Sequence, residues 1–171
     1  MKHLFLYEDY AGERYPTVYH GSPFAFREFS YEHLGKNTKH DPKDVGFHFS
    51  DELATCMTYS KAYKIRIEHK YAELVGVPHP HPSGISPQLV TAKLLISNPL
   101  CLEYSKEINR DSIRHAEFNG YDAIIARISG FGLEYVVFDT DNIDILRIDP
   151  LVYDLETDTF RAGELIIPGN L

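Results

Sequence analysis

The chain has 171 residues, 43% of them hydrophobic, which is enough for one domain over 1–171 whose core needs neither disulfides nor metal. Its 25 acidic residues against 17 basic ones give a formal net charge of -8, so a nucleic acid is disfavoured as the default partner and a protein or small molecule is favoured. No stretch is long enough to span a membrane and the N-terminal apolar run is too short for a signal peptide. We therefore expect a cytoplasmic protein, although delivery without a cleaved signal could carry it elsewhere.

The N-terminal part of the chain predicts a short strand over residues 17–20. These residues are β-branched or aromatic and are followed by Gly21, which indicates a strand that runs into a turn. Phe24, Phe26 and Phe29 then alternate with polar residues, so we expect all three rings to pack on the same core.

A second short strand, over residues 46–50, is expected after a polar loop over residues 35–45. Ser50 and Asp51 carry side-chain oxygens of the kind that cap helices, so a helix is predicted to begin directly after them. We expect this helix to continue to about Tyr63 or a little further.

The middle of the chain predicts a stiff loop, a strand and a second helix. Three prolines within residues 77–84 remove backbone donors and fix their own torsions, which indicates an exposed loop. Residues 89–96 form a clear strand pattern. A helix is then predicted from Ser105 to Asn119, where Gly120 ends it.

The last third of the chain predicts strands over residues 122–128, 133–138 and 143–148, and a hairpin around residues 155–159. These strands have short connections, and only two helices are evident. We therefore expect an α+β fold with a mixed or largely antiparallel sheet, and not a doubly wound parallel one.

Three short strings, far apart in the chain, each place one polar side chain at the end of an apolar run. Their polar residues are His20 in Tyr-His-Gly-Ser, His48 in Gly-Phe-His-Phe-Ser, and Glu134 in Leu-Glu-Tyr-Val-Val-Phe, and Tyr59 follows His48 by eleven positions. Three strands could bring these side chains to one cleft. In order and spacing, the strings resemble the motifs of the ADP-ribosyltransferase superfamily over roughly residues 17–148.

The resemblance implies a split β-sandwich of mixed or antiparallel sheets with two or three helices, and NAD as the substrate. ADP-ribosyl transfer breaks the bond between a ribose carbon and nicotinamide, and its transition state resembles the oxocarbenium ion of glycoside cleavage. A carboxylate that accepts a hydrogen bond from the ribose 2′-hydroxyl would favour this developing cation. Glu134 is the candidate catalytic residue for that role.

The resemblance also implies the dinucleotide contacts. His20 would bind the adenosine ribose, Gly21 would hold the nicotinamide amide with its main chain, and Ser22 completes the motif. A Cβ at position 21 would collide with a flat ring lying against the backbone, which is a physical reason for glycine there.

His48 stands where the family usually has a tyrosine, and Tyr59 would be the second of two rings that sandwich nicotinamide, with Ser50 supporting the site. An imidazole can still stack, but a protonated one would repel the cationic nicotinamide, so the neutral form is expected to be competent. Activity should therefore fall at mildly acid pH.

The acceptor expected from the sequence is not arginine. Arginine-modifying members carry Glu or Gln two residues before the catalytic Glu, where this chain has Gly132. The pattern is more similar to the His-Tyr-Glu branch, which includes diphtheria-type toxins and poly(ADP-ribose) polymerases, and to small transferase domains of phage and bacterial effectors. We therefore expect mono-ADP-ribosyl transfer to a macromolecule, with a protein favoured over a nucleic acid, and release of nicotinamide.

Other interpretations stay open. The same pocket could hydrolyse NAD if water attacks the sugar, or it could be a binding module that has lost activity. His79 and His81 alternate in an extended segment, as the ligands of a metal hydrolase can, but no acidic or cysteine companion lies nearby, so no metal is expected. Cys56 and Cys101 have neither metal nor redox spacing and are expected to be buried and reduced.

Each candidate residue also has a purely structural interpretation when taken alone. His20 could be an ordinary turn residue, and His48 a partly buried histidine with a backbone partner. Tyr59 could pack in the core of its helix, and Glu134 could be an exposed strand-end glutamate.

Overall fold

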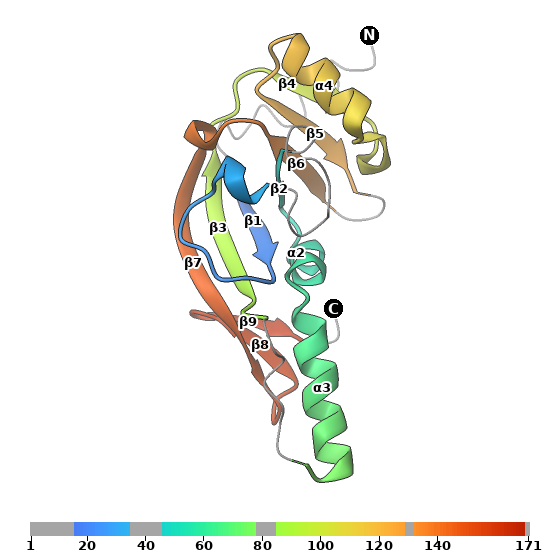
Figure 1. Ribbon diagram of the computed structural model, residues 1–171, viewed down its shortest axis with the longest axis vertical. Coiled ribbons are helices and arrows are strands. Elements are labelled where there is room, and N and C mark those ends of the chain that lie inside the picture. The colour runs from blue at the N-terminus through green and yellow to red at the C-terminus, as the bar shows by residue number, and fades with distance from the viewer. Residues whose placement is uncertain (1–15, 35–45, 78–84, 129–131, 170–171) are drawn as a thin grey trace.

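The computed structural model describes residues 16–34, 46–77, 85–128 and 132–169. Over these residues the fold is α+β, with nine strands and three α-helices (Figure 1). The strands are β1 (Thr17–Ser22), β2 (Phe47–Ser50), β3 (Gln88–Leu94), β4 (Pro99–Leu102), β5 (Ala123–Arg127), β6 (Leu133–Val137), β7 (Ile143–Asp154), β8 (Thr159–Ala162) and β9 (Leu165–Pro168). The helices are α2 (Leu53–Ser60), α3 (Ala62–Val75) and α4 (Arg110–Phe118), with short 3₁₀ turns at Tyr31–His33, Ser105–Glu107 and Thr140–Asn142.

The strands form one mixed sheet in the order β4-β5-β6-β2-β1-β3-β7-β8-β9. Only β4 and β5 are parallel, and every other pair is antiparallel. The α+β class and the mixed sheet expected from the sequence are therefore confirmed.

The two halves of the sheet are joined at a single point between β1 and β2. These strands share one register pair, Tyr19 opposite Ser50, whereas β1 pairs with β3 along its whole length and β2 does the same with β6. Beyond that pair β1 and β2 separate. Figure 1 shows the result, with β2, β5, β6 and α4 in one part of the molecule, β3, β7, β8 and β9 in the other, and α2 at the junction.

Three buried clusters hold this arrangement together, because successive side chains of a strand face opposite sides of the sheet. Ile124 and Val136 pack with Ile113 and Ala116 of α4, while their neighbours Ile125 and Val137 pack on the other side. That second cluster also contains Val18, Phe47, Phe49, Ala92, Leu94 and Tyr135. The third joins α2 and the start of α3 to β3 and the C-terminal strands through Cys56, Met57, Ala62, Leu89, Leu151 and Phe160.

The helix predicted after Ser50 is present but broken into two. Lys61 adopts a left-handed conformation, with φ of 58°, between α2 and α3. Ser60 is fully buried there, and its hydroxyl donates to the Met57 carbonyl oxygen (2.8 Å) and accepts from the Ala62 amide (3.2 Å). The buried serine is therefore the last residue of α2 and also bonds to the first residue of α3, while Lys61 is the N-cap residue of α3. α3 runs on to Val75, well beyond the end that the sequence indicated.

The predicted cap of that helix was wrong in detail. Glu52, not Ser50 or Asp51, is the N-cap residue of α2, and it makes no side-chain capping bond. The Ser50 hydroxyl accepts from the Glu52 amide (3.0 Å), and Asp51 Oδ1 instead accepts from the Leu133 amide (2.6 Å). Asp51 thus continues the attachment of β2 to β6 beyond the last residue of β2.

Differences in the remaining elements are local. The helix expected from Ser105 is a short 3₁₀ turn followed by α4, whose N-cap Asn109 accepts from the Asp111 and Ser112 amides. β4 begins at Pro99, where the sequence indicated only the end of a strand. β7 continues to Asp154, and its hairpin with β8 confirms the turn predicted around residues 155–159.

Of the three phenylalanines expected in one core, Phe26 and Phe29 are half-buried, but Phe24 is 49% exposed.

The predicted loops over residues 35–45 and 78–84 lie outside the described residues, as does most of the turn before Gly132. Within the described part of the chain, none of the helices combines the length and the apolar character needed to traverse a bilayer.

Candidate functional site

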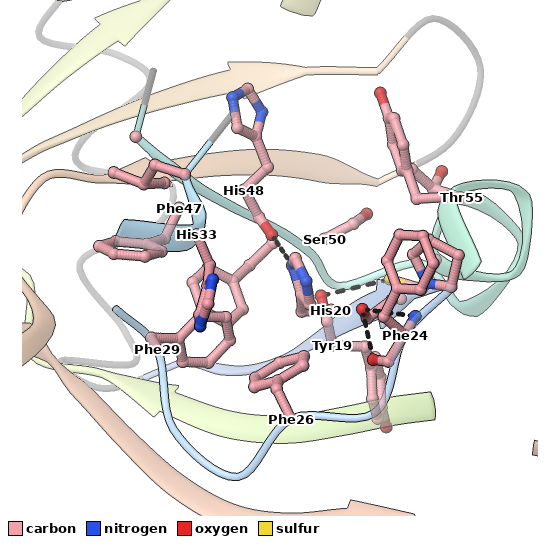
Figure 2. A pocket seen from close by; sticks show the side chains of 18 of the residues that line it. Tyr19, His20, Phe24, Phe26, Phe29, His33, Phe47, His48, Ser50 and Thr55 are labelled. Carbon is pink, nitrogen blue, oxygen red and sulfur yellow. Dashed lines mark hydrogen bonds between the residues drawn. The ribbon is translucent and has the colours of Figure 1, made fainter. Parts of the chain in front are cut away.

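A cavity of about 900 Å³ lies where β1 and β2 separate. The seven residues that the sequence singled out all line it: His20, Gly21, Ser22, His48, Ser50, Tyr59 and Glu134. They come from β1, β2, α2 and β6, and the segment between β1 and the first 3₁₀ turn completes the wall with Phe24, Phe26 and Phe29 (Figure 2). Such a volume is within the range of small-molecule and cofactor pockets.

His20 bridges the gap between the separated strands. Its Nδ1 lies 2.7 Å from the backbone carbonyl oxygen of His48, and because a carbonyl can only accept, Nδ1 carries the proton (Figure 2). The ring meets Phe26, Phe29 and Phe49 with centroid separations of 5.9, 5.2 and 5.6 Å. Burial, together with the neighbouring His48, lowers the pKa of His20 from 6.5 to about 4. His20 is therefore neutral near pH 7, and its Nε2 is left as an acceptor.

Gly21 is required by the protein itself. A Cβ at this position would collide with the carbonyl oxygen of Cys56 and would lie 3.0 Å from the Ser60 amide nitrogen, because α2 packs directly on β1. The structure thus gives helix packing as a reason for glycine here, and the approach of a ring stays a prediction. Ser22 is also engaged, since its hydroxyl donates to the Phe24 carbonyl oxygen (2.8 Å) and accepts from the Phe24 amide (3.2 Å).

His48 and Glu134 are hydrogen-bonded to each other across β2 and β6. The distance from His48 Nδ1 to Glu134 Oε1 is 2.8 Å, and the side chains are 34% and 12% exposed. Glu134 stands opposite Ser50 in the ladder, so its strand position is fixed. The sequence indicated a role for each residue but gave no sign of this bond.

Ser50 is buried beside Glu134, and its hydroxyl accepts a hydrogen bond from the amide of Glu52, the N-cap residue of α2. Tyr59, at the other end of α2, is 53% exposed and also lines the cavity. Partial burial and the negative charge of Glu134 raise the pKa of the Tyr59 phenol. Tyr59 is therefore a protonated phenol that interacts electrostatically with the Glu134 carboxylate. Its ring is accessible and is not packed in the core.

Cys56 is a residue of the site that the sequence did not identify. Its thiol lies between the separating strands and donates to the Tyr19 carbonyl oxygen, with a sulfur to oxygen distance of 3.2 Å. Burial raises its pKa to about 12, so the thiol stays protonated. The approach of α2 to Gly21 places Cys56 here, and a lone cysteine in a helical segment carries no sequence signal for such a contact.

A metal centre finds no support in the described residues, which contain no group of three or more metal-ligating side chains. His79 and His81, the candidates from the sequence, lie outside the described residues.

No family model and no curated protein sequence matches the chain. Among solved structures, one similar chain belongs to the crystal structure of the M. tuberculosis MbcT-MbcA toxin-antitoxin complex. The TM-score is 0.48 and the sequence identity 12%, over 81% of this chain and 85% of that chain. A similarity of this size carries no argument about the activity of this protein.

Proposed function

We propose that the protein is an NAD-dependent mono-ADP-ribosyltransferase that releases nicotinamide and transfers ADP-ribose to a macromolecule, with a protein as the favoured acceptor. The observation that carries the proposal is that Glu134, His20 and Tyr59, three residues far apart in the chain, line one cavity at the separation of β1 and β2. The resemblance of those strings to the transferase motifs supports the same proposal.

Glu134 would stabilise the transition state. Its Oε1 accepts from His48, which leaves Oε2 to accept from the ribose 2′-hydroxyl as positive charge develops on the sugar. The carboxylate is only 12% exposed, so its charge acts in a partly water-excluded setting, where electrostatic interactions are stronger than in bulk water.

His20 would bind the second ribose. A neutral imidazole whose Nδ1 is already donating has one remaining function, which is to accept a hydrogen bond at Nε2. A ribose hydroxyl is a suitable donor. The three phenylalanine rings around His20 prevent the imidazole from turning and so fix the direction of that acceptor.

Nicotinamide would lie near the mouth of the cavity. Tyr59 and Phe24 are both lining residues and both about half exposed, so their ring faces are accessible to a flat ligand. The cationic ring would gain from an aromatic face and from the nearby carboxylate. His48 is less suited to stacking than the sequence suggested, because one of its ring nitrogens is bonded to Glu134.

The test is incubation of the purified protein with NAD, with and without a cell lysate, while free nicotinamide and labelled macromolecules are measured. We expect Glu134→Gln to reduce nicotinamide release by about 10²-fold or more, because the substitution removes the charge but keeps the shape. The matched control is Glu117→Gln on the exposed surface of α4, which should retain full activity.

The outcomes separate the related functions. Nicotinamide release with a labelled acceptor supports the transferase, and release without any acceptor identifies an NAD glycohydrolase. Absence of release, together with binding of NAD by calorimetry, would identify an inactive binding module and overturn the proposal.

A further inference from the structure

We propose that His48 is the general base of the reaction, oriented by Glu134, and that the acceptor is a hydroxyl group, either water or an alcohol of a macromolecule. This inference rests on the proposed function and names the class of acceptor at the same site. The geometry that carries it is the bond of 2.8 Å between His48 Nδ1 and Glu134 Oε1, two residues that line the cavity.

The bond fixes where the proton of the neutral imidazole lies. An ionised carboxylate can only accept, so Nδ1 donates and Nε2 keeps its lone pair. A carboxylate that holds a histidine in this tautomer also stabilises the imidazolium formed when the histidine takes up a proton. His48 therefore has the electronic arrangement of a general base.

The position of the pair is rigid, and it is accessible to a ligand. Glu134 is held by the ladder of β2 and β6, and the His48 backbone is held by the bond from His20 to its carbonyl oxygen. His48 is 34% exposed and Glu134 only 12%, so the ring forms the outer member of the pair. The base is thus presented to a ligand, while its orienting carboxylate is protected.

Three other titratable groups that line the cavity, His20, Cys56 and Tyr59, do not offer a better base. His20 carries its proton on Nδ1 and is packed among phenylalanine rings, and Cys56 is a protonated thiol. Tyr59 is a phenol whose pKa is raised. Glu28 and His33 also line the cavity, from the segment after β1, and both are exposed, whereas His48 and Glu134 are partly buried.

The step balances without a further reactant. The bond between C1′ and the nicotinamide nitrogen breaks, and nicotinamide leaves with the electron pair. The hydroxyl oxygen of the acceptor forms the new bond to C1′, and its proton passes to His48 Nε2 and then to solvent. Glu134 Oε1 holds the resulting imidazolium, while Oε2 remains directed to the ribose.

A hydroxyl acceptor also agrees with the space beside Glu134. Arginine-modifying relatives use an acidic or amide side chain two residues before the catalytic Glu, and that position is Gly132 here. A Cβ at Gly132 would collide with Asp51 Oδ1, so the structure has no room for such a side chain. A guanidinium would therefore lack its partner, whereas a hydroxyl needs only the base.

The experiment compares His48→Gln and His48→Ala with the wild type, using water or a lysate acceptor on one hand and azide on the other. Azide is an anionic nucleophile with no proton to lose. We expect both variants to release nicotinamide 10²- to 10⁴-fold more slowly with hydroxyl acceptors, and azide to restore the rate of His48→Ala to within about tenfold of wild type. Glu134→Gln should not be restored, and His115→Ala on α4 should behave as wild type.

Thermal melting establishes that each variant is folded. If His48→Ala is unstable, His48→Gln serves in its place, because it keeps an amide that can donate to Glu134. Equal losses with azide and with water would mean that His48 only positions the site, and the inference would be wrong while the proposed function stood. Absence of nicotinamide release from the wild type under all conditions would instead contradict the proposed function itself.

Discussion

His20 Nδ1 donates a hydrogen bond of 2.7 Å to the backbone carbonyl oxygen of His48, at the point where the ladder between β1 and β2 has ended. A side chain thus replaces the backbone bond that would otherwise close the sheet. The cavity lies where the two strands separate, and the His20 side chain spans the gap between them.

Replacement of His20 by Ala should therefore destabilise the fold as well as the site. The variant leaves the His48 carbonyl without its donor and removes a ring that packs among Phe26, Phe29 and Phe49. We expect a loss of about 2–4 kcal/mol in the free energy of unfolding, measured in urea. The control His115→Ala, an exposed position on α4, should change it by less than about 0.5 kcal/mol.

The stability of the protein should fall in mild acid because of His20. The pKa of His20 is lowered from 6.5 to about 4, so between these values the unfolded chain binds a proton that the folded protein excludes. The resulting loss in the free energy of unfolding is absent above about pH 6.5 and grows as the pH falls. It is nearly complete near pH 4, where it reaches about 3 kcal/mol at most.

The comparison that isolates this contribution is His20→Asn. The amide nitrogen of Asn lies near the place of Nδ1, so the bond to the His48 carbonyl oxygen can be kept while the titrating ring is lost. Urea unfolding at pH 7, 5.5 and 4 should show a smaller loss of stability for the variant than for the wild type. Parallel pH profiles for the two proteins would show that His20 does not carry the effect.

Both cysteines should resist modification in the native protein. Burial raises the pKa of Cys56 to about 12 and also raises that of Cys101, and the reactive species is the thiolate. A thiol reagent at pH 8 should therefore label neither residue within minutes, whereas both should react after unfolding in urea. Rapid labelling of native Cys56, located by peptide mapping, would contradict the packing of α2 on β1.

The sequence predicted the α+β class, most strands and a common location for the candidate residues, because those features depend on local patterns. His20, His48 and Glu134 each lie beside an apolar run within β1, β2 or β6, and strands of one sheet can bring such side chains to one cavity. The turn expected at Gly21 was wrong, because β1 continues through Gly21 to Ser22. The functional roles of these residues remain predictions, to be decided by the experiments above.

What the sequence could not show depends on contacts between distant residues. The break at Lys61 has no glycine or proline to mark it, and it follows from the burial of Ser60. Likewise, the bond between His48 and Glu134 joins residues 86 positions apart, and the need for glycine at position 21 comes from the backbone of Cys56. Patterns of one segment contain no information about such partners.

Asp158 should couple α3 to the turn between β7 and β8. Its carboxylate accepts two bonds from Arg66, at 2.7 and 2.8 Å, one from Lys70 and one from the Tyr153 hydroxyl. Its φ is 51°, a conformation that Asn tolerates better than Ala does. Hydrogen exchange in α3 should therefore accelerate in Asp158→Asn, which loses the charge and one of the two acceptor oxygens, and more strongly in Asp158→Ala, which loses both oxygens. Unchanged protection of α3 in both variants would show that these bonds do not hold the helix.

The close approach of Asp51 to Gly132 should make that glycine indispensable. Asp51 Oδ1 accepts from the Leu133 amide at 2.6 Å, which fixes the residue next to Glu134, and a Cβ at Gly132 would occupy the same place. Gly120 offers a matched comparison, because its φ of 73° is also positive but no atom lies within 4 Å of an added Cβ.

We expect Gly120→Ala to cost about 1 kcal/mol, from backbone strain alone, and Gly132→Ala to cost more, since strain and collision add. Gly132→Ala should also slow nicotinamide release, because displacement of Asp51 frees the strand that carries Glu134. Gly132→Glu should lose activity in the same way and gain no ability to modify arginine. If the glutamate variant instead modified an arginine-rich peptide, the space beside Glu134 would have to be open, and the preference for a hydroxyl acceptor would lose its steric reason.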